Sequence, residues 1–208
     1  MNLGKPFYNI IPQVNPTKPN DFELDFDDNF ITLFSLGTLT SAKGQDLTIR
    51  FIHKHINAFS KPLRYIIVGR GPLKNQLLSE LDKIKKENPS FIYHYYESLP
   101  HETVMLIHKI SDIYIMLHRI SIFDFATLEA MSQHSAIILS KIGGNLDFDM
   151  NSNIIFAEDV EANESILIKA DFPSLKENNY NVFNCHFSKE AFVNQYKEFF
   201  EQMLVKEK

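Results

Sequence analysis

The strongest constraint on the fold is an alternation of short apolar runs with longer stretches that carry apolar residues at helical spacing. The short runs are typical of buried strands and stand at 30–36, 64–69, 91–95, 112–117, 136–140 and 153–157. The helical stretches between them stand at 43–58, 73–87, 100–110 and 126–133. A strand, a helix and another strand in succession form a βαβ unit with parallel strands. The sequence therefore predicts an α/β fold, a Rossmann-like doubly wound parallel sheet of about six strands.

The chain of 208 residues suits one such domain with a flanking segment at each end. Residues 1–29 are rich in Pro, Asn and Asp, the composition of a linker. Residues 30–187 hold the predicted sheet, although 158–187 shows no clear periodicity. Residues 188–208 begin with Ser188, a residue that favours helix N-caps, and continue with an apolar stripe at helical spacing. This last segment is predicted to be a C-terminal helix.

Composition narrows the classes of function. A net charge of −5 gives no reason to expect a nucleic-acid partner. The single cysteine, Cys185, cannot form an internal disulfide, which is typical of a reducing, cytoplasmic setting. No apolar run is long enough to predict a transmembrane helix, and the first residues lack the apolar core of a signal peptide. His101 and His108 could share a helix face, but no third ligand is spaced to join them, so no metal site is expected.

Four segments that follow predicted strands are the candidate site. Parallel sheets bind ligands at the carboxyl ends of their strands, near the point where the strand order switches. We therefore expect these segments to gather along one edge of the sheet; they are Gly37–Lys43, Arg70–Pro72, Ser121–Phe125 and Gly143–Asn145.

Three charged residues in and beside these segments have two interpretations each. Lys43 follows small residues and precedes a helix, so it could bind a phosphate, or it could be an ordinary solvated lysine. Arg70 in its glycine turn could reach a phosphate or remain in solvent. Glu129 lies early in a predicted helix, where it could accept hydrogen bonds from sugar hydroxyls or merely suit the helix dipole.

Several motifs in order resemble the group 1 glycosyltransferases, the large retaining family four. The main one is FDFATLEAM at 123–131, followed by Ser140 and by Gly143-Gly144-Asn145. Lys43-Gly44 and the Val-Gly-x-Gly-Pro turn at 68–72 are also similar to the family's motifs. The resemblance covers about residues 5–150, with a weaker echo in the last helix. It implies the C-terminal, donor-binding half of a GT-B-type enzyme.

The resemblance also implies a nucleotide-sugar site and a role for some of its residues. The diphosphate of the donor would lie at Lys43, the ribose at Glu129 and the base beside the backbone at 97–99, while Ser121 would touch the sugar. The full set of candidate binding residues is Gly37, Thr38, Lys43, Arg70, Gly71, Ser98, Leu99, Ser121, Phe123, Glu129, Gly143 and Gly144. No residue is assigned a catalytic role, and no metal is implied.

The sequence departs from the family pattern at three positions. Thr38 stands where the family has an arginine that holds the diphosphate, and Ser121 stands where it has a first glutamate. Asp124 replaces the usual glycine. A threonine donates one hydrogen bond and no charge, so phosphate binding should be weaker here than in the family.

Two functional hypotheses follow. The first is a donor-binding domain that, joined to an acceptor domain, transfers a sugar from a UDP- or GDP-type donor to a hydroxyl acceptor with retention, as in polysaccharide biosynthesis. No other cofactor is expected. Its partners would be the nucleotide sugar and an N-terminal acceptor domain or partner subunit outside this chain, in the cytoplasm, with peripheral contact to the inner face of the membrane left open. The alternative is a degenerate, non-catalytic domain that acts as a partner or regulatory subunit.

Overall fold

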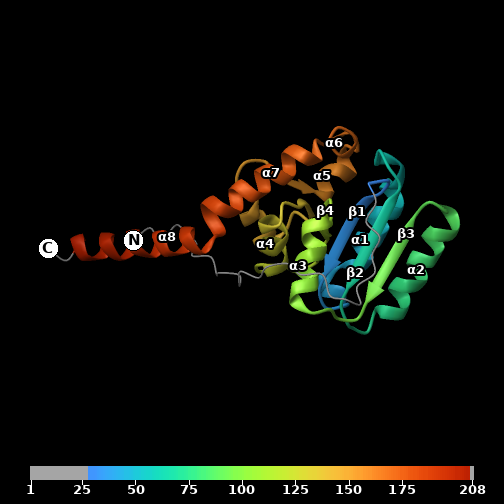
Figure 1. Ribbon diagram of the computed structural model, residues 1–208, viewed down its shortest axis with the longest axis horizontal. Helices are drawn as coiled ribbons and strands as arrows, with labels where there is room; N and C mark the ends of the chain where they lie inside the picture. The colour runs from blue at the N-terminus through green and yellow to red at the C-terminus, as the bar shows by residue number, and fades with distance from the viewer. Residues whose placement is uncertain (1–27, 207–208) are drawn as a thin grey trace.

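The computed structural model describes residues 28–206, with side chains described as far as Met203 (Figure 1). Nearly all of the N-terminal segment 1–29 lies outside the described residues, and so does its interpretation as a linker.

Six parallel strands form one sheet in the order β3-β2-β1-β4-β5-β6. Their bounds are Ile31–Leu36 for β1, Leu63–Val68 for β2, Ile92–Tyr96 for β3, Ile113–Met116 for β4, Ala136–Leu139 for β5 and Ile154–Phe156 for β6. Each lies within a residue or two of the run that predicted it, which confirms the α/β class and the doubly wound sheet. The chain builds outward from β1 in one direction and then from β4 in the other, so the strand order switches between these two strands.

Helices cover both faces of this sheet (Figure 1). Their bounds are Gln45–His55 for α1, Lys74–Glu87 for α2, His101–Ile110 for α3, Phe125–Ser132 for α4, Ala157–Ala162 for α5, Ser165–Ile168 for α6, Phe172–Val182 for α7 and Lys189–Lys206 for α8. Short 3-10 turns stand at η1, Ser41–Lys43, at η2, Ile56–Ala58, and at η3, Gly143–Phe148, and a π turn, η4, at Phe183–Phe187.

The helix predicted at 43–58 is shorter than expected. Gly44 has φ +70°, the left-handed conformation that glycine adopts at low cost, and it separates η1 from α1. Lys43 therefore ends a 3-10 turn in the loop after β1, where the prediction had it begin the helix.

The strand side chains alternate between two buried layers, as the pleat of a strand requires. Leu33 and Ile115 pack in the layer under α1 and α2, while Phe34, Tyr114 and Met116 pack in the layer under α3 and α4. All five side chains are fully buried. Burial on both faces fixes the strand register, and the register places the carboxyl ends of β1 and β4 side by side.

The C-terminal helix begins where Ser188 was predicted to cap it. The Ser188 Oγ accepts the Ala191 N–H at 3.1 Å. In Figure 1, α8 extends away from the layers of the α/β body. No helix among residues 28–206 is long and apolar enough to cross a bilayer.

Candidate functional site

The segments that follow β1, β4 and β5 meet at one edge of the sheet because glycines let their backbones touch. A Cβ on Gly44 would lie 1.8 Å from the Leu117 carbonyl oxygen, at the end of β4. A Cβ on Gly144 would lie 1.5 Å from the Ile122 carbonyl oxygen. Real Cβ atoms never approach so closely, so only glycine permits these contacts. These three segments therefore gather as predicted, and the fourth, Arg70–Pro72, joins them through a 2.8 Å hydrogen bond from the Leu39 N–H to the Arg70 carbonyl.

An ion pair crosses the centre of this edge. The Lys43 Nζ donates to the Asp124 Oδ1 at 3.1 Å, and it links the loop after β1 to the beginning of α4. The Lys43 side chain is 33% exposed, whereas that of Asp124 is only 7% exposed. Lys43 was interpreted as a solvated or a phosphate-binding residue, and the structure shows that a carboxylate already holds its ammonium.

Asp124 is also the N-cap of α4. Its Oδ2 accepts the Thr127 N–H at 3.2 Å and the Thr127 hydroxyl at 3.0 Å. The Tyr114 hydroxyl, which rises from β4, donates to the same oxygen at 3.0 Å. Four donors thus converge on one carboxylate, which explains how the charge of Asp124 is tolerated in a buried position.

A neutral histidine lies beside this pair. His118 follows β4 and is almost completely buried, and neither of its ring nitrogens has a hydrogen-bond partner. Its Nε2 is 3.7 Å from the Asp124 Oδ1, too far for a hydrogen bond. Burial lowers the pKa of His118, Lys43 lowers it further and Asp124 opposes both. His118 therefore adds no positive charge to the site at neutral pH.

Glu129 lies on α4 between two histidines. The ring Nε2 of His101 contacts the Glu129 Oε1 at 2.9 Å, and that of His108 is 3.8 Å from the Oε2. Burial raises the pKa of Glu129, and the hydrogen bond from His101 opposes this shift. The Glu129 side chain is only 12% exposed, and a ligand that bound both of its carboxylate oxygens would have to displace His101.

Ser121 is held by a small polar network. Its Oγ donates to the Asn145 Oδ1 at 2.7 Å, and the Asn145 Nδ2 donates to the Ser140 carbonyl at 2.9 Å. Asn145 is fully buried, so this network joins the segment after β4 to η3. Phe123 in the same segment packs its ring against Phe148, with the centroids 4.9 Å apart.

Comparison with known proteins decides the family. The model of the family described as glycosyl transferases group 1 matches residues 17–162, more than half of the chain. The chain belongs to the group 1 glycosyltransferases. A search of the curated proteins gave no match.

Solved structures show that this group 1 glycosyltransferase chain has the fold of one part of GT-B enzymes. TarM from S. aureus, solved with UDP and a GlcNAc-glycerol, has a TM-score of 0.66 at 13% identity over 92% of this chain and 38% of its own. The pneumococcal O-GlcNAc transferase GtfA, solved with UDP and GlcNAc, gives 0.65 at 14% over 84% and 36%.

A third structure matches along nearly its whole length. The catalytic domain of a cholesterol-α-glucosyltransferase from Helicobacter pylori gives a TM-score of 0.60 at 14% identity over 74% of this chain and 98% of its own. This chain spans less than two fifths of TarM and of GtfA. The family match does not favour the alternative of a degenerate, non-catalytic domain.

The glycine turn after β2 lies beside the loop after β1, since the Leu39 N–H donates to the Arg70 carbonyl at 2.8 Å. The Arg70 Nη2 donates to the Ser98 hydroxyl at 3.1 Å, and its Nε is 3.8 Å from the Glu97 carboxylate. Gly71 lies against the backbone of Leu39 in the loop after β1. Leu99 packs against the core layer under α3 and α4. Arg70 thus has a partner on the segment that precedes α3, where the base was predicted to lie.

An ion pair that the sequence did not indicate fixes the loop after β1. Arg119 donates to both Asp46 carboxylate oxygens, at 2.7 and 2.6 Å, and also to the Ser41 carbonyl at 2.8 Å. This bidentate contact lowers the pKa of Asp46 despite its partial burial. The pair joins residues 73 positions apart, so no local pattern could have revealed it.

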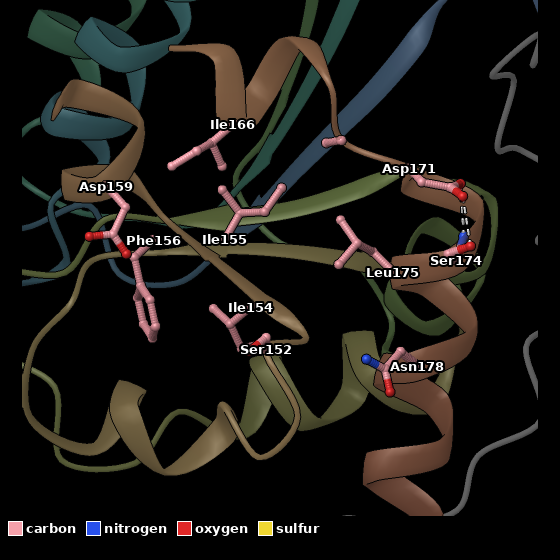
Figure 2. Close-up of a pocket in the computed structure, with 11 residues that line it drawn as sticks. Ser152, Ile154, Ile155, Phe156, Asp159, Ile166, Asp171, Ser174, Leu175 and Asn178 are labelled. Atoms are coloured by element: carbon pink, nitrogen blue, oxygen red, sulfur yellow. Dashed lines mark hydrogen bonds between the residues drawn. The ribbon is translucent and has the colours of Figure 1, made fainter. Parts of the chain in front are cut away.

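A cavity of about 360 Å³ lies elsewhere, beside β6 and under α6 and α7 (Figure 2). Its floor is apolar, with Ile154, Ile155 and Leu175. Its acidic groups already have partners, since Asp159 pairs with Lys141 and Asp171 caps α7 through Ser174. None of the predicted site residues lines it. Among residues 28–206, no cluster of side chains is arranged to hold a metal ion.

Proposed function

We propose that this domain binds a nucleotide diphosphate sugar across the carboxyl ends of β1 and β4. The observation that supports this most is the convergence of the loop after β1 with the beginning of α4, through the 3.1 Å contact of Lys43 with Asp124. Glu129 lies on the same helix α4. A cationic side chain, a helix N-terminus and a carboxylate that can accept hydroxyl hydrogen bonds are the groups that a nucleotide diphosphate requires.

In the proposed reaction the donor loses its sugar to a hydroxyl acceptor with retention. The bond between the anomeric carbon and the diphosphate oxygen breaks, a bond from that carbon to the acceptor oxygen forms, and the acceptor proton passes to the departing diphosphate, directly or through water. Lys43 and the backbone amide of Thr38 would stabilise the negative charge that develops on the diphosphate. Ser121 would contact the sugar.

The acceptor is proposed to be held by a second domain or a partner subunit. One Rossmann-like half supplies donor contacts but no opposite wall to orient an acceptor or exclude water. TarM and GtfA, which are more than twice as long as the parts that this chain matches, were both solved with UDP. A uridine donor is therefore the first to test, with a guanosine donor second. A cytoplasmic location remains part of the proposal.

The proposed donor site can be tested through the recognition of the ribose by Glu129. A carboxylate that accepts a hydroxyl hydrogen bond contributes roughly 1.5–3 kcal/mol, which is about ten- to a hundredfold in affinity. We expect Glu129→Gln to weaken UDP binding by about tenfold or more. We expect 2′,3′-dideoxy-UDP to bind wild type and Glu129→Gln equally, because it lacks both hydroxyls. Calorimetric titration of the 208-residue chain measures all four affinities.

Glu87→Gln is the matched control, because Glu87 also pairs with a histidine, His53 at 2.7 Å, but on an exposed surface of α2. It should leave the affinity for UDP unchanged. Equal binding of UDP by wild type and Glu129→Gln would contradict the assignment of the ribose, and absence of binding to UDP and to GDP would contradict the proposed donor site.

A further inference from the structure

The beginning of α4 already holds an anion. The Asp124 carboxylate accepts a helix N-terminal N–H from Thr127, two hydroxyl groups and the ammonium of Lys43. These are the kinds of donor that bind a phosphate at a helix N-terminus. In the group 1 pattern this position is usually glycine, which has no side chain to accept hydrogen bonds from such donors. In this chain the Asp124 carboxylate occupies these donors, at the proposed diphosphate site.

The other described basic side chains near Lys43 are neutral or engaged elsewhere, so they do not add to its positive charge in the proposed site. His118 is held neutral by burial, and Arg119 is engaged by both oxygens of Asp46. Arg70 contacts Ser98 and Glu97. The Asp124 carboxylate is paired with the Lys43 ammonium, and the two formal charges sum to zero.

We propose that Asp124 is a specificity-determining residue that competes with the diphosphate of the donor for Lys43. This inference rests on the proposed donor site. When a donor binds, the Lys43 ammonium leaves the carboxylate for the phosphate, and the lost ion pair offsets most of the new contact. The site consequently discriminates weakly between ligands of different phosphate charge, and the nucleoside portion contributes most of the affinity.

A purely structural role for Asp124 is distinguishable because asparagine is as good an N-cap as aspartate. In Asp124→Asn the amide oxygen still accepts from Thr127 and Tyr114, while the negative charge is gone. The capping of α4 should therefore persist, and Lys43 should be released. An N-cap role alone predicts no gain in the affinity for phosphate.

The experiment titrates the 208-residue chain with UDP, UMP and uridine by calorimetry. Asp124→Asn should bind UDP about ten- to a hundredfold more tightly than wild type, the size of one charge-assisted contact. UMP should gain less, and uridine should not change. Adding Lys43→Ala to Asp124→Asn should remove the gain. Raising the salt concentration should weaken the binding of UDP to Asp124→Asn more than to wild type.

The matched control is Asp171→Asn, which makes the same change at the N-cap of α7 and should leave every affinity unchanged. Thermal melting of each variant checks the fold. If wild type binds UDP and Asp124→Asn binds it equally or more weakly, the inference that Asp124 competes for Lys43 is wrong, while the proposed donor site stands. If neither protein binds UDP or GDP, the donor site is wrong and this inference falls with it.

Discussion

Replacing Gly44 with alanine should destabilise the domain by roughly 3–5 kcal/mol, because it combines backbone strain with a backbone clash. Gly44 has φ +70°, which costs other residues about 1–2 kcal/mol. The added Cβ would also lie 1.8 Å from the Leu117 carbonyl oxygen, which belongs to the backbone and cannot turn away like a side chain. The loop after β1 would have to withdraw from β4. Urea denaturation followed by circular dichroism measures the loss.

Gly37→Ala separates the two causes. Gly37 also has a positive φ, of +154°, but an added Cβ would meet only side-chain atoms, the nearest being the Met116 Cε at 3.5 Å. Its loss of stability should therefore be the smaller, about 1–2 kcal/mol. Equal losses at the two glycines would mean that the approach to Leu117 contributes nothing.

The second large effect is the dependence of stability on the ionisation of His108. This residue is completely buried on α3, and neither of its ring nitrogens has a hydrogen-bond partner. Its ring contacts Phe34 edge-on, with the centroids 4.7 Å apart. Burial lowers the pKa of His108 from 6.5 to about 3, with a smaller opposing effect from Asp124. The folded state therefore holds the ring neutral where the unfolded chain would protonate it.

The direction of the effect follows from proton counting. Between pH 6.5 and about 3 the unfolded state binds more protons at this residue than the folded state, so the free energy of unfolding falls as the pH falls. At about pH 4.5 the loss amounts to about 2–3 kcal/mol relative to neutral pH. His108→Phe keeps an aromatic ring in this layer and removes the proton site. It should therefore be more stable than wild type at pH 4.5 by about that amount, relative to their difference at pH 7.5.

Denaturant titrations of both proteins at the two pH values check this, because the acidic groups that they share cancel in the comparison. His53→Gln provides the control: it removes a histidine whose side chain is 45% exposed, and so tests whether burial, rather than the loss of any histidine, is the cause. Parallel stability curves for wild type and His108→Phe would show that His108 has an ordinary pKa.

The strands and their parallel pairing were predictable because the sequence patterns that indicate them are local. A run such as Ile31–Leu36 is apolar throughout, which is what burial on both faces demands. The helices after it carry their apolar residues on one side. The position of the loops at the carboxyl edge followed from the topology of parallel strands. The motifs at Lys43 and Glu129 indicated which of these loops hold the candidate site.

The charge state of the site was not predictable, because it depends on contacts between distant residues. Lys43 and Asp124 are 81 positions apart, and only the sheet brings them together. The burial of His118 likewise depends on elements that lie on either side of β4. The stretch 158–187 shows no clear period for a different reason. The short helices α5 and α6 bury only Ala157, Val160 and Leu167, and the longer α7 buries only Asn179 and Val182, too few residues to produce a period.

The backbone contacts of Gly44 and Gly144 also affect the rate and the free energy of ligand binding. Loops held against neighbouring backbone lose their conformational freedom when the domain folds, so little ordering is left for the moment of binding. In the proposed arrangement, donor association should proceed with a small entropic penalty from this domain. Any slow closing motion would then be a rigid-body movement of this domain against the proposed acceptor domain, with the hinge outside the sheet.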